Sequence, residues 1–210
     1  MEKTKNGVFE SLVLFVLIGL TSFGAQARDF NKPVDFEPVF VTGVKPELVS
    51  IERLKPGLSA VYYLEFFERS LNEIPTSTHS KYRSVTGKPV LELNHQFGKE
   101  QVFGSRTNRG VAMRLTGYLY FKEIGEYQLQ ALSNDGVGVA IDENLVISDP
   151  EQHSDRLSNV GHVSVETAGY YPLRVEYFQR KGTAALKLFW KVPGSDDFLP
   201  IPQNVYVHLP

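Results

Sequence analysis

Two adjacent polar residues, Asn134 and Asp135, carry the clearest chemical potential in this sequence. They lie in the stretch Ser-Asn-Asp-Gly-Val at residues 133–137, between two segments (126–132 and 137–142) in which apolar and polar residues alternate. Such alternation is typical of strands, and Asp-Gly favours a tight turn, so one interpretation is a plain hairpin corner. The other is a ligand loop, because the side-chain oxygens of Asn and Asp suit a hard cation such as calcium. The local residues leave both interpretations open.

Other motifs for catalysis or metal binding are missing from the sequence. It has no glycine-rich phosphate loop, no Gly-x-Ser-x-Gly elbow and no His-Glu-x-x-His, and its five histidines are scattered, which predicts surface or loop positions for most of them. A glycoside hydrolase needs only two carboxylates at a suitable separation, so a hydrolase stays open as a third hypothesis. Because no catalytic set is marked, we expect a protein that is not an enzyme. Trp190, on the apolar side of its segment, is predicted to anchor the core rather than stack on a sugar.

The segments that must position Asn134 and Asp135 are predicted to be strands. Residues 111–121 place large apolar side chains on one parity and polar or tyrosine side chains on the other, and similar alternation recurs at 171–177 and 184–192. No segment after residue 27 has a helical period. Short strands with Gly and Pro corners predict an all-β fold, an antiparallel β-sandwich or barrel. Residues 88–93 are expected to add a short strand, and the polar residues 148–161 a loop of functional length.

Residues 1–27 are predicted to be a secretory signal peptide. Lys3 and Lys5 give a positive start, residues 12–20 are apolar, and Ala-Gln-Ala at 25–27 is a cleavage signal that predicts a mature start at Arg28. The apolar run is shorter than the roughly 20 residues of a spanning helix, so we expect no stable membrane span after cleavage. The absence of cysteine fits a bacterial periplasm or cell surface better than a eukaryotic secretory route.

Composition limits the remaining organisation. The chain has 210 residues, 42% of them hydrophobic and 22% charged, which fits one globular domain with a proline-punctuated linker or edge segment at 28–55. The net charge is -2 with no long basic run, which argues against nucleic-acid binding, since that requires a cationic surface. The remaining residues, 56–210, form the predicted domain.

An ordered series of short stretches resembles one known module, the protective-antigen-fourteen domain named from anthrax toxin protective antigen. That module also occurs in fungal flocculins and in bacterial glycosidases and surface proteins. The resembling stretches are Gly-Leu at 57–58, Tyr-Tyr at 62–63, Leu-Thr-Gly-Tyr-Leu at 115–119, Gly-Glu-Tyr-Gln-Leu at 125–129, Ser-Asn-Asp-Gly-Val at 133–137, Ile-Asp at 141–142, Leu-Val-Ile at 145–147, the ten residues 169–178, Leu-Lys-Leu-Phe-Trp at 186–190 and Ile-Pro at 201–202. No single stretch is specific, but their order and spacing match from about Pro56 to the C-terminus.

The resemblance implies a lectin-like site at the tip of a β-sandwich. In the sugar-binding members, two adjacent aspartates joined by a cis peptide bond and a later asparagine hold a calcium ion, which the hydroxyls of a glycan complete. The aspartate pair aligns with Asn134 and Asp135, and the asparagine loop with Gln179, Arg180 and Lys181. This chain departs from that pattern: Asn134 removes one negative charge, Gln179 is a longer amide, and two cations follow it. Calcium affinity falls as ligand charge falls, which puts the ion in question.

These residues support two main hypotheses. The first is an exported carbohydrate-binding module, calcium-assisted through Asp135, Asn134 and Gln179, that recognises a cell-surface or extracellular glycan. If calcium is not used, Arg180 or Lys181 is expected to hold an acidic sugar directly. The second is a docking or assembly module for an envelope protein, without a sugar site, in which the same two cations meet carboxylates of the partner.

Overall fold

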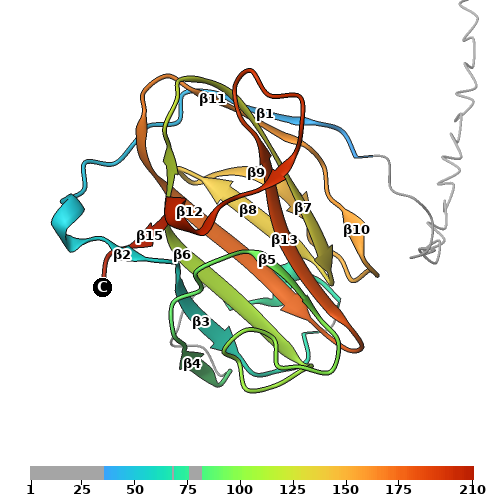
Figure 1. Ribbon diagram of the computed structural model, residues 1–210. Coiled ribbons are helices and arrows are strands. Elements are labelled where there is room, and N and C mark those ends of the chain that lie inside the picture. The colour runs from blue at the N-terminus through green and yellow to red at the C-terminus, as the bar shows by residue number, and fades with distance from the viewer. Residues whose placement is uncertain (1–35, 68, 76–81) are drawn as a thin grey trace, which may run out of the picture.

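The fold of the chain is a two-layered β-sandwich (Figure 1). The computed structural model describes residues 36–67, 69–75 and 82–210, so the predicted signal peptide at 1–27 lies outside the described residues. Its strands are mainly antiparallel and form two sheets. The expected all-β fold is confirmed, and it takes the form of a sandwich. Helical structure in the described part of the chain is limited to three-residue turns, none of which has the length or apolar character to cross a membrane.

The first sheet, sheet A, has seven strands in the order β1-β11-β7-β13-β14, with β10 beside β7 and β5 beside β13. These strands are β1 (Val39–Val41), β5 (Asn94–Phe97), β7 (Gly125–Asn134), β10 (Arg156–Leu157), β11 (Gly161–Val165), β13 (Ala184–Lys191) and β14 (Leu199–Pro200). The edge strand β1 belongs to the proline-punctuated segment and pairs with β11 in parallel. Residues 38–41 therefore extend the sandwich, while the 3-10 turn η1 (Ile51–Arg53) has no buried residue.

The second sheet, sheet B, has eight strands in the order β2-β15-β6-β12-β8-β9, with β3 beside β6 and β4 beside β3. These strands are β2 (Lys55–Pro56), β3 (Ser59–Tyr63), β4 (Ser84–Thr86), β6 (Val111–Phe121), β8 (Val137–Ile141), β9 (Asn144–Asp149), β12 (Gly169–Gln179) and β15 (Tyr206–His208). Strands β6 and β12 pair along their whole lengths, from Val111 opposite Gln179 to Phe121 opposite Gly169. The two remaining 3-10 turns, η2 (Leu71–Glu73) and η3 (Gln203–Val205), lie in connections.

The core lies between the sheets and is built from the predicted apolar parity. Met113, Leu115, Leu119 and Phe121 of β6 are all fully buried, as the period of two requires for one face of a strand. Trp190 packs against Phe121 and Tyr127 of that core, with ring centroids 6.3 and 5.7 Å apart. Trp190 is half-buried at the margin of the core, which agrees with the core interpretation only in part.

A second, smaller cluster covers the outer face of sheet B at one end. It consists of Tyr63, Phe67, Ile74, Ala112 and Phe178. Both faces of β12 are buried here, because Tyr177, Phe178 and Gln179 in succession are at most 1% exposed. The chain that supplies Phe67 and Ile74 thus folds over the end of sheet B, which gives that end the depth needed for a pocket.

Two local predictions are wrong. Residues 133–137 are not a hairpin corner, because β7 belongs to sheet A and β8 to sheet B, and the loop crosses from one sheet to the other. Residues 88–93 do not form a strand; Val90 makes only an isolated bridge to Leu58, and the strand follows at β5. Turn chemistry and alternation describe single segments, and neither reveals which sheet a strand joins.

Candidate functional site

Four chain segments meet at one end of the sandwich, where β7 and β12 end and β8 and β13 begin (Figure 1). They enclose a pocket of about 440 Å³. Its lining residues are Arg69, Asn134, Asp135, Gln152, His153, Ser154, Arg180, Lys181, Gly182 and Thr183. The structure thus brings together Asn134, Asp135, Arg180 and Lys181, four of the five residues that the sequence singled out. The fifth, Gln179, lies directly before them at the end of β12.

Asp135 provides a buried carboxylate in the pocket wall. Its side chain is only 2% exposed, and its Oδ2 accepts a hydrogen bond from the backbone N–H of Arg180 at 2.7 Å. Its own backbone N–H donates to the carbonyl of Phe178 at 3.1 Å. Burial raises the pKa of Asp135, and the backbone hydrogen bond and charge of Arg180, together with His153, offset that rise only in part. The site therefore contains a carboxylate that is incompletely compensated by the protein.

Asn134 links three of the segments. The peptide bond between Asn134 and Asp135 is cis, as the family resemblance implied. The Asn134 side-chain amide donates to Asp155 Oδ1 at 2.8 Å and approaches Thr183 Oγ1 at 3.5 Å. Its carbonyl accepts a hydrogen bond from the hydroxyl of Tyr177, in β12. Asn134 therefore holds the loop after β7 against the loops before β10 and β13.

Gln179 lies below the pocket and is directed at the loop that follows it. It is 1% exposed, and its Nε2 donates to the carbonyls of Thr183 at 3.1 Å and Gly182 at 3.4 Å. Its Oε1 is buried and has no hydrogen-bond partner among the described residues. Arg180 is half-buried and Lys181 is exposed. Arg180 and Lys181 thus line the pocket, while Gln179 is buried beneath them and bonds to the loop at Gly182 and Thr183.

Sequence reasoning missed part of the lining. Gln152, His153 and Ser154 belong to the polar loop that was expected to be functional from its length, although no residue in it was singled out. Arg69 carried no signal, because it reaches the pocket through a distant pairing in which the Gln152 backbone donates to the Arg69 carbonyl at 2.9 Å. Such a contact between chain segments far apart in sequence leaves no local pattern.

Comparisons with known proteins identify the family. Residues 54–204 match the PA14 domain, the protective-antigen-fourteen module. The chain belongs to the PA14 domain family. No curated protein sequence matches this PA14 chain.

Solved structures share the fold. The Epithelial Adhesin 9 A domain of Candida glabrata, solved with Galβ1-4GlcNAc, has a TM-score of 0.63 at 13% identity, covering 82% of this chain and 96% of that one. The PA14 sugar-binding domain from an RTX adhesin has a TM-score of 0.54 at 12% identity, covering 73% and 98%. An anti-sigma factor domain-containing protein from Clostridium clariflavum has a TM-score of 0.57 at 20% identity, covering 72% and 47%. This PA14 chain thus spans about half the length of that last protein, and at these identities the likeness is one of fold.

A buried ion-pair cluster supports the pocket of this PA14 domain from behind. Asp149 is 1% exposed, with Arg156 Nε at 2.9 Å and His153 Nε2 at 3.0 Å from its Oδ2. Burial raises the pKa of Asp149, but the hydrogen bonds and charges of Arg156 and His153 outweigh it and leave the pKa below its ordinary value. His153 is 4% exposed but lies in a loop, as predicted for most of the histidines, whereas His208 is 7% exposed and lies in β15, so it fits neither a surface nor a loop position. The cluster fixes the loop that carries Gln152, His153 and Ser154.

The side chains around Asn134 and Asp135 do not fit a calcium ion. Calcium takes six to eight oxygen ligands, but Asn134 and Gln179 turn amide nitrogens, which cannot coordinate it, toward the neighbouring oxygens. Asp155 is engaged at both oxygens, by Asn134 and by Gln96 Nε2 at 3.0 Å. The remaining carboxylate, Asp135, lies beside the positive charge of Arg180. In the described part of the chain, no three Asp, Glu or His side chains are grouped to hold a metal.

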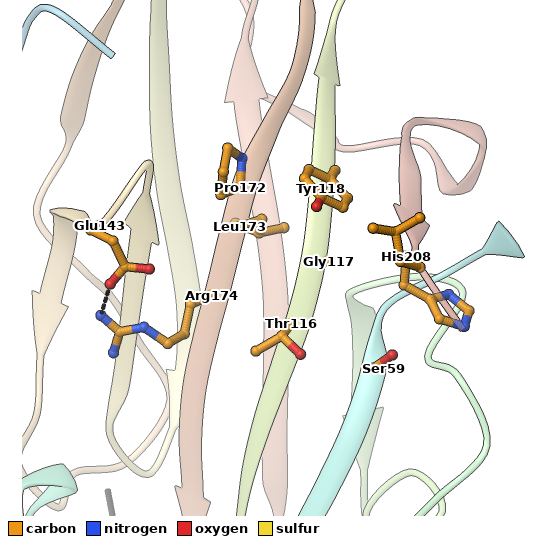
Figure 2. Close-up of a pocket in the computed structure, with 10 residues that line it drawn as sticks. Ser59, Thr116, Gly117, Tyr118, Glu143, Pro172, Leu173, Arg174 and His208 are labelled. Carbon is orange, nitrogen blue, oxygen red and sulfur yellow. Dashed lines mark hydrogen bonds and ion pairs between the residues drawn. The ribbon is translucent and has the colours of Figure 1, made fainter. Parts of the chain in front are cut away.

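A second pocket, of about 270 Å³, lies on the outer face of sheet B between β3, β6, β12 and β15. Figure 2 shows its one acidic lining residue, Glu143, paired with Arg174, and the two side chains are 3.3 Å apart. The pocket at the loops likewise has one lining carboxylate, Asp135. Neither pocket holds the pair of acids that the hydrolase hypothesis requires.

Proposed function

We propose that this PA14 domain is an exported carbohydrate-binding module whose sugar site is the pocket around Asp135. The observation that carries the proposal is the buried Asp135 carboxylate, fixed by the Arg180 backbone N–H, in the wall of an open polar pocket. A carboxylate that is desolvated and incompletely compensated is a strong acceptor for the hydroxyl groups of a saccharide. Family membership supports this assignment, as do two neighbours in fold: an adhesin domain solved with a galactose-containing disaccharide and a sugar-binding domain of an RTX adhesin.

The charges of the pocket favour a saccharide that carries an acidic group. Its lining includes two adjacent cationic side chains, Arg180 and Lys181, and a single carboxylate, Asp135. Guanidinium groups bind carboxylates with two parallel hydrogen bonds, whereas a neutral sugar uses only the hydroxyl contacts. A uronic acid unit therefore matches the pocket better than a neutral hexose.

A glycan array at physiological ionic strength tests this function. We expect acidic oligosaccharides to bind, and Asp135→Asn to abolish the signal. Asp197→Asn, the same change at an exposed residue in the turn after β13, should leave binding intact. Binding of neutral glycans alone would reject the acidic preference. Absence of any glycan ligand would reject the carbohydrate assignment, and capture of an acidic envelope protein in a pull-down would favour the docking hypothesis instead.

Export is proposed from the sequence of residues 1–27, with the periplasm or cell surface as the destination. A secreted or periplasmic product that begins at Arg28 is the expected result of N-terminal sequencing after expression of the full chain in bacteria. A product that keeps residues 1–27 and stays in the cytoplasm would contradict this prediction. Export would place the pocket in the compartment where extracellular glycans occur.

A further inference from the structure

Two side-chain amides occupy the place where the three pocket loops converge. Asn134 is the last residue of β7, and Gln179 is the last residue of β12. Asn134 Nδ2 contacts Asp155 Oδ1 and Thr183 Oγ1, and Gln179 Nε2 contacts the carbonyls of Gly182 and Thr183. Each NH₂ group therefore faces two oxygens, and the two amides together tie residues 133–136, 152–155 and 179–183 into one unit.

Electrostatics determines which atom of each amide faces these oxygens. An amide oxygen directed at the Asp155 carboxylate or at two backbone carbonyls would repel them, whereas an NH₂ group donates up to two hydrogen bonds. Gln179 keeps this orientation although its buried Oε1 is then left without a partner among the described residues. In this orientation Nε2 donates to the carbonyls of both Gly182 and Thr183, which the amide oxygen could not do.

Carboxylate and carbonyl oxygens are also the ligands that calcium prefers. Here amide hydrogens face them instead: Asn134 Nδ2 faces Asp155 Oδ1, and Gln179 Nε2 faces the Thr183 carbonyl. The charges of the side chains also agree with amide groups in place of a cation. Asn134 and Gln179 are neutral, and Asp135 receives a hydrogen bond from the Arg180 backbone and lies beside the Arg180 charge.

We propose that Asn134 and Gln179 replace a metal ion as the organisers of this site, so that the pocket is formed, and its saccharide is bound, without calcium. The organisation of the loops stands on the hydrogen bonds above, and only the statement about the saccharide rests on the proposed function. Two amide side chains hold the loops in place by hydrogen bonds, and the ligand then contacts protein groups such as Asp135 directly.

The first test is thermal unfolding of the mature wild-type chain, with about 10 mM calcium and with a chelator in its place. Extracellular calcium modules bind with dissociation constants of up to about 1 mM, so a calcium site would be filled at this concentration. We expect the two Tm values to agree. A Tm that rises with calcium by about 3–6 °C, the shift expected for a tenfold excess over such a constant in a chain of this length, would overturn the proposal.

The second test restores the ion ligands. In the double variant Asn134→Asp with Gln179→Asn, a second carboxylate replaces the amide next to Asp135, and the shorter amide no longer reaches the loop carbonyls. We expect this variant to gain a calcium-dependent rise in Tm of about 3–6 °C. Gln203→Asn with Asn204→Asp makes the same two changes at exposed residues of η3 and should gain none. A folded double variant that does not respond to calcium would show that these amides do not replace the ion.

A third measurement keeps the proposal testable if the double variant does not fold. Gln179→Ala alone removes the bonds to Gly182 and Thr183, and we expect faster amide hydrogen exchange in residues 180–184 that calcium does not reverse. Reversal by calcium would contradict the proposal. The glycan experiment separates the two claims: binding that requires calcium in the wild type overturns this inference, whereas absence of binding under either condition rejects the proposed function and leaves the Tm comparison to decide.

Discussion

The backbone N–H of Arg180 donates to Oδ2 of Asp135 across 2.7 Å, which joins the loop after β12 to the loop after β7. The two residues are 45 positions apart in sequence, yet this bond sets the orientation of the one carboxylate that lines the pocket. It also leaves the charge of Asp135 buried, which lowers stability, whereas the proposed saccharide site requires that charge.

Replacement of Asp135 by Asn should stabilise the protein while it removes glycan binding. The folded-state pKa of Asp135 is raised mainly by burial, so its favourable contribution is complete below its ordinary pKa and is lost as pH rises through the folded value. At pH 7 the ionised side chain therefore costs stability, and Asn avoids this while its Oδ1 can still accept from Arg180. We expect calorimetry to show a Tm higher by roughly 2–4 °C, or about 1 kcal/mol.

The gain from Asp135→Asn should disappear in acid. Below about pH 3 the wild-type carboxyl is protonated as well, so the two proteins should unfold at nearly the same temperature. A stabilisation that persists unchanged at low pH would mean that it does not come from the buried charge.

Asp149 should behave in the opposite way. Burial raises its pKa, but Arg156 and His153 more than offset this, so the net pKa is lowered. Its contribution is therefore present above the ordinary pKa and is lost as pH falls through the folded value. Asp149→Asn should destabilise the domain at pH 7 by roughly 3 kcal/mol, because it leaves a partly buried guanidinium without its partner. Urea unfolding at pH 7 and pH 3 measures this, and the difference should shrink at pH 3; Asp196→Asn, at an exposed site, should cost little at either pH.

Tyr177→Phe should weaken both stability and binding. The Tyr177 hydroxyl donates to the Asn134 carbonyl, and its loss leaves that buried carbonyl one partner short, at a cost of about 1–2 kcal/mol. Tyr171→Phe is a matched control, since Tyr171 lies on the same strand and its hydroxyl donates to the Thr167 carbonyl at the opposite end. The two variants should lose similar stability in urea titrations, but only Tyr177→Phe should reduce glycan affinity. Equal affinities would show that the Asn134 loop does not depend on this bond.

Gly136→Ala should disturb the pocket through packing. A Cβ at Gly136 would lie 2.6 Å from the Pro150 carbonyl oxygen and 2.7 Å from Phe178 Cε1, and neither atom belongs to a flexible side-chain end. The methyl group must displace the segment that leads to Gln152 and His153, so we expect a loss of about 1–3 kcal/mol and weaker binding. Gly98→Ala, whose added Cβ would meet only the tip of the Glu100 side chain, should be tolerated in the same thermal assay.

The sequence predicted the sandwich because its information is local and repeated. Alternation over residues 111–121 places five large side chains on one face, and that face must pack against a second layer to be buried. The ordered series of motifs added the family and the position of the site. Asn134, Asp135, Arg180 and Lys181 were identified because they align with the ligand loops of the family that the motif series resembles.

The hairpin prediction failed for a reason that applies to the whole site. Residues 133–137 have the composition of a corner, but the partner strands are chosen by packing between layers, and β7 and β8 join different sheets. For the same reason Arg69 and His153 could not be assigned from the sequence, since they reach the pocket through the pairing of residues 69–71 with residues 150–152.

By itself the sequence determined the fold class, because alternation is a local property of the chain, and its ordered motifs indicated the family and the candidate site at Asn134 and Asp135. Only the tertiary structure decided what Asn134 and Gln179 do there. Their amides are potential cation ligands through oxygen and hydrogen-bond donors through nitrogen, and the chain alone does not say which atom faces inward. Asp155 Oδ1, from another loop, faces the Asn134 amide, and the carbonyls of Gly182 and Thr183 face the Gln179 amide, so electrostatics selects the nitrogens.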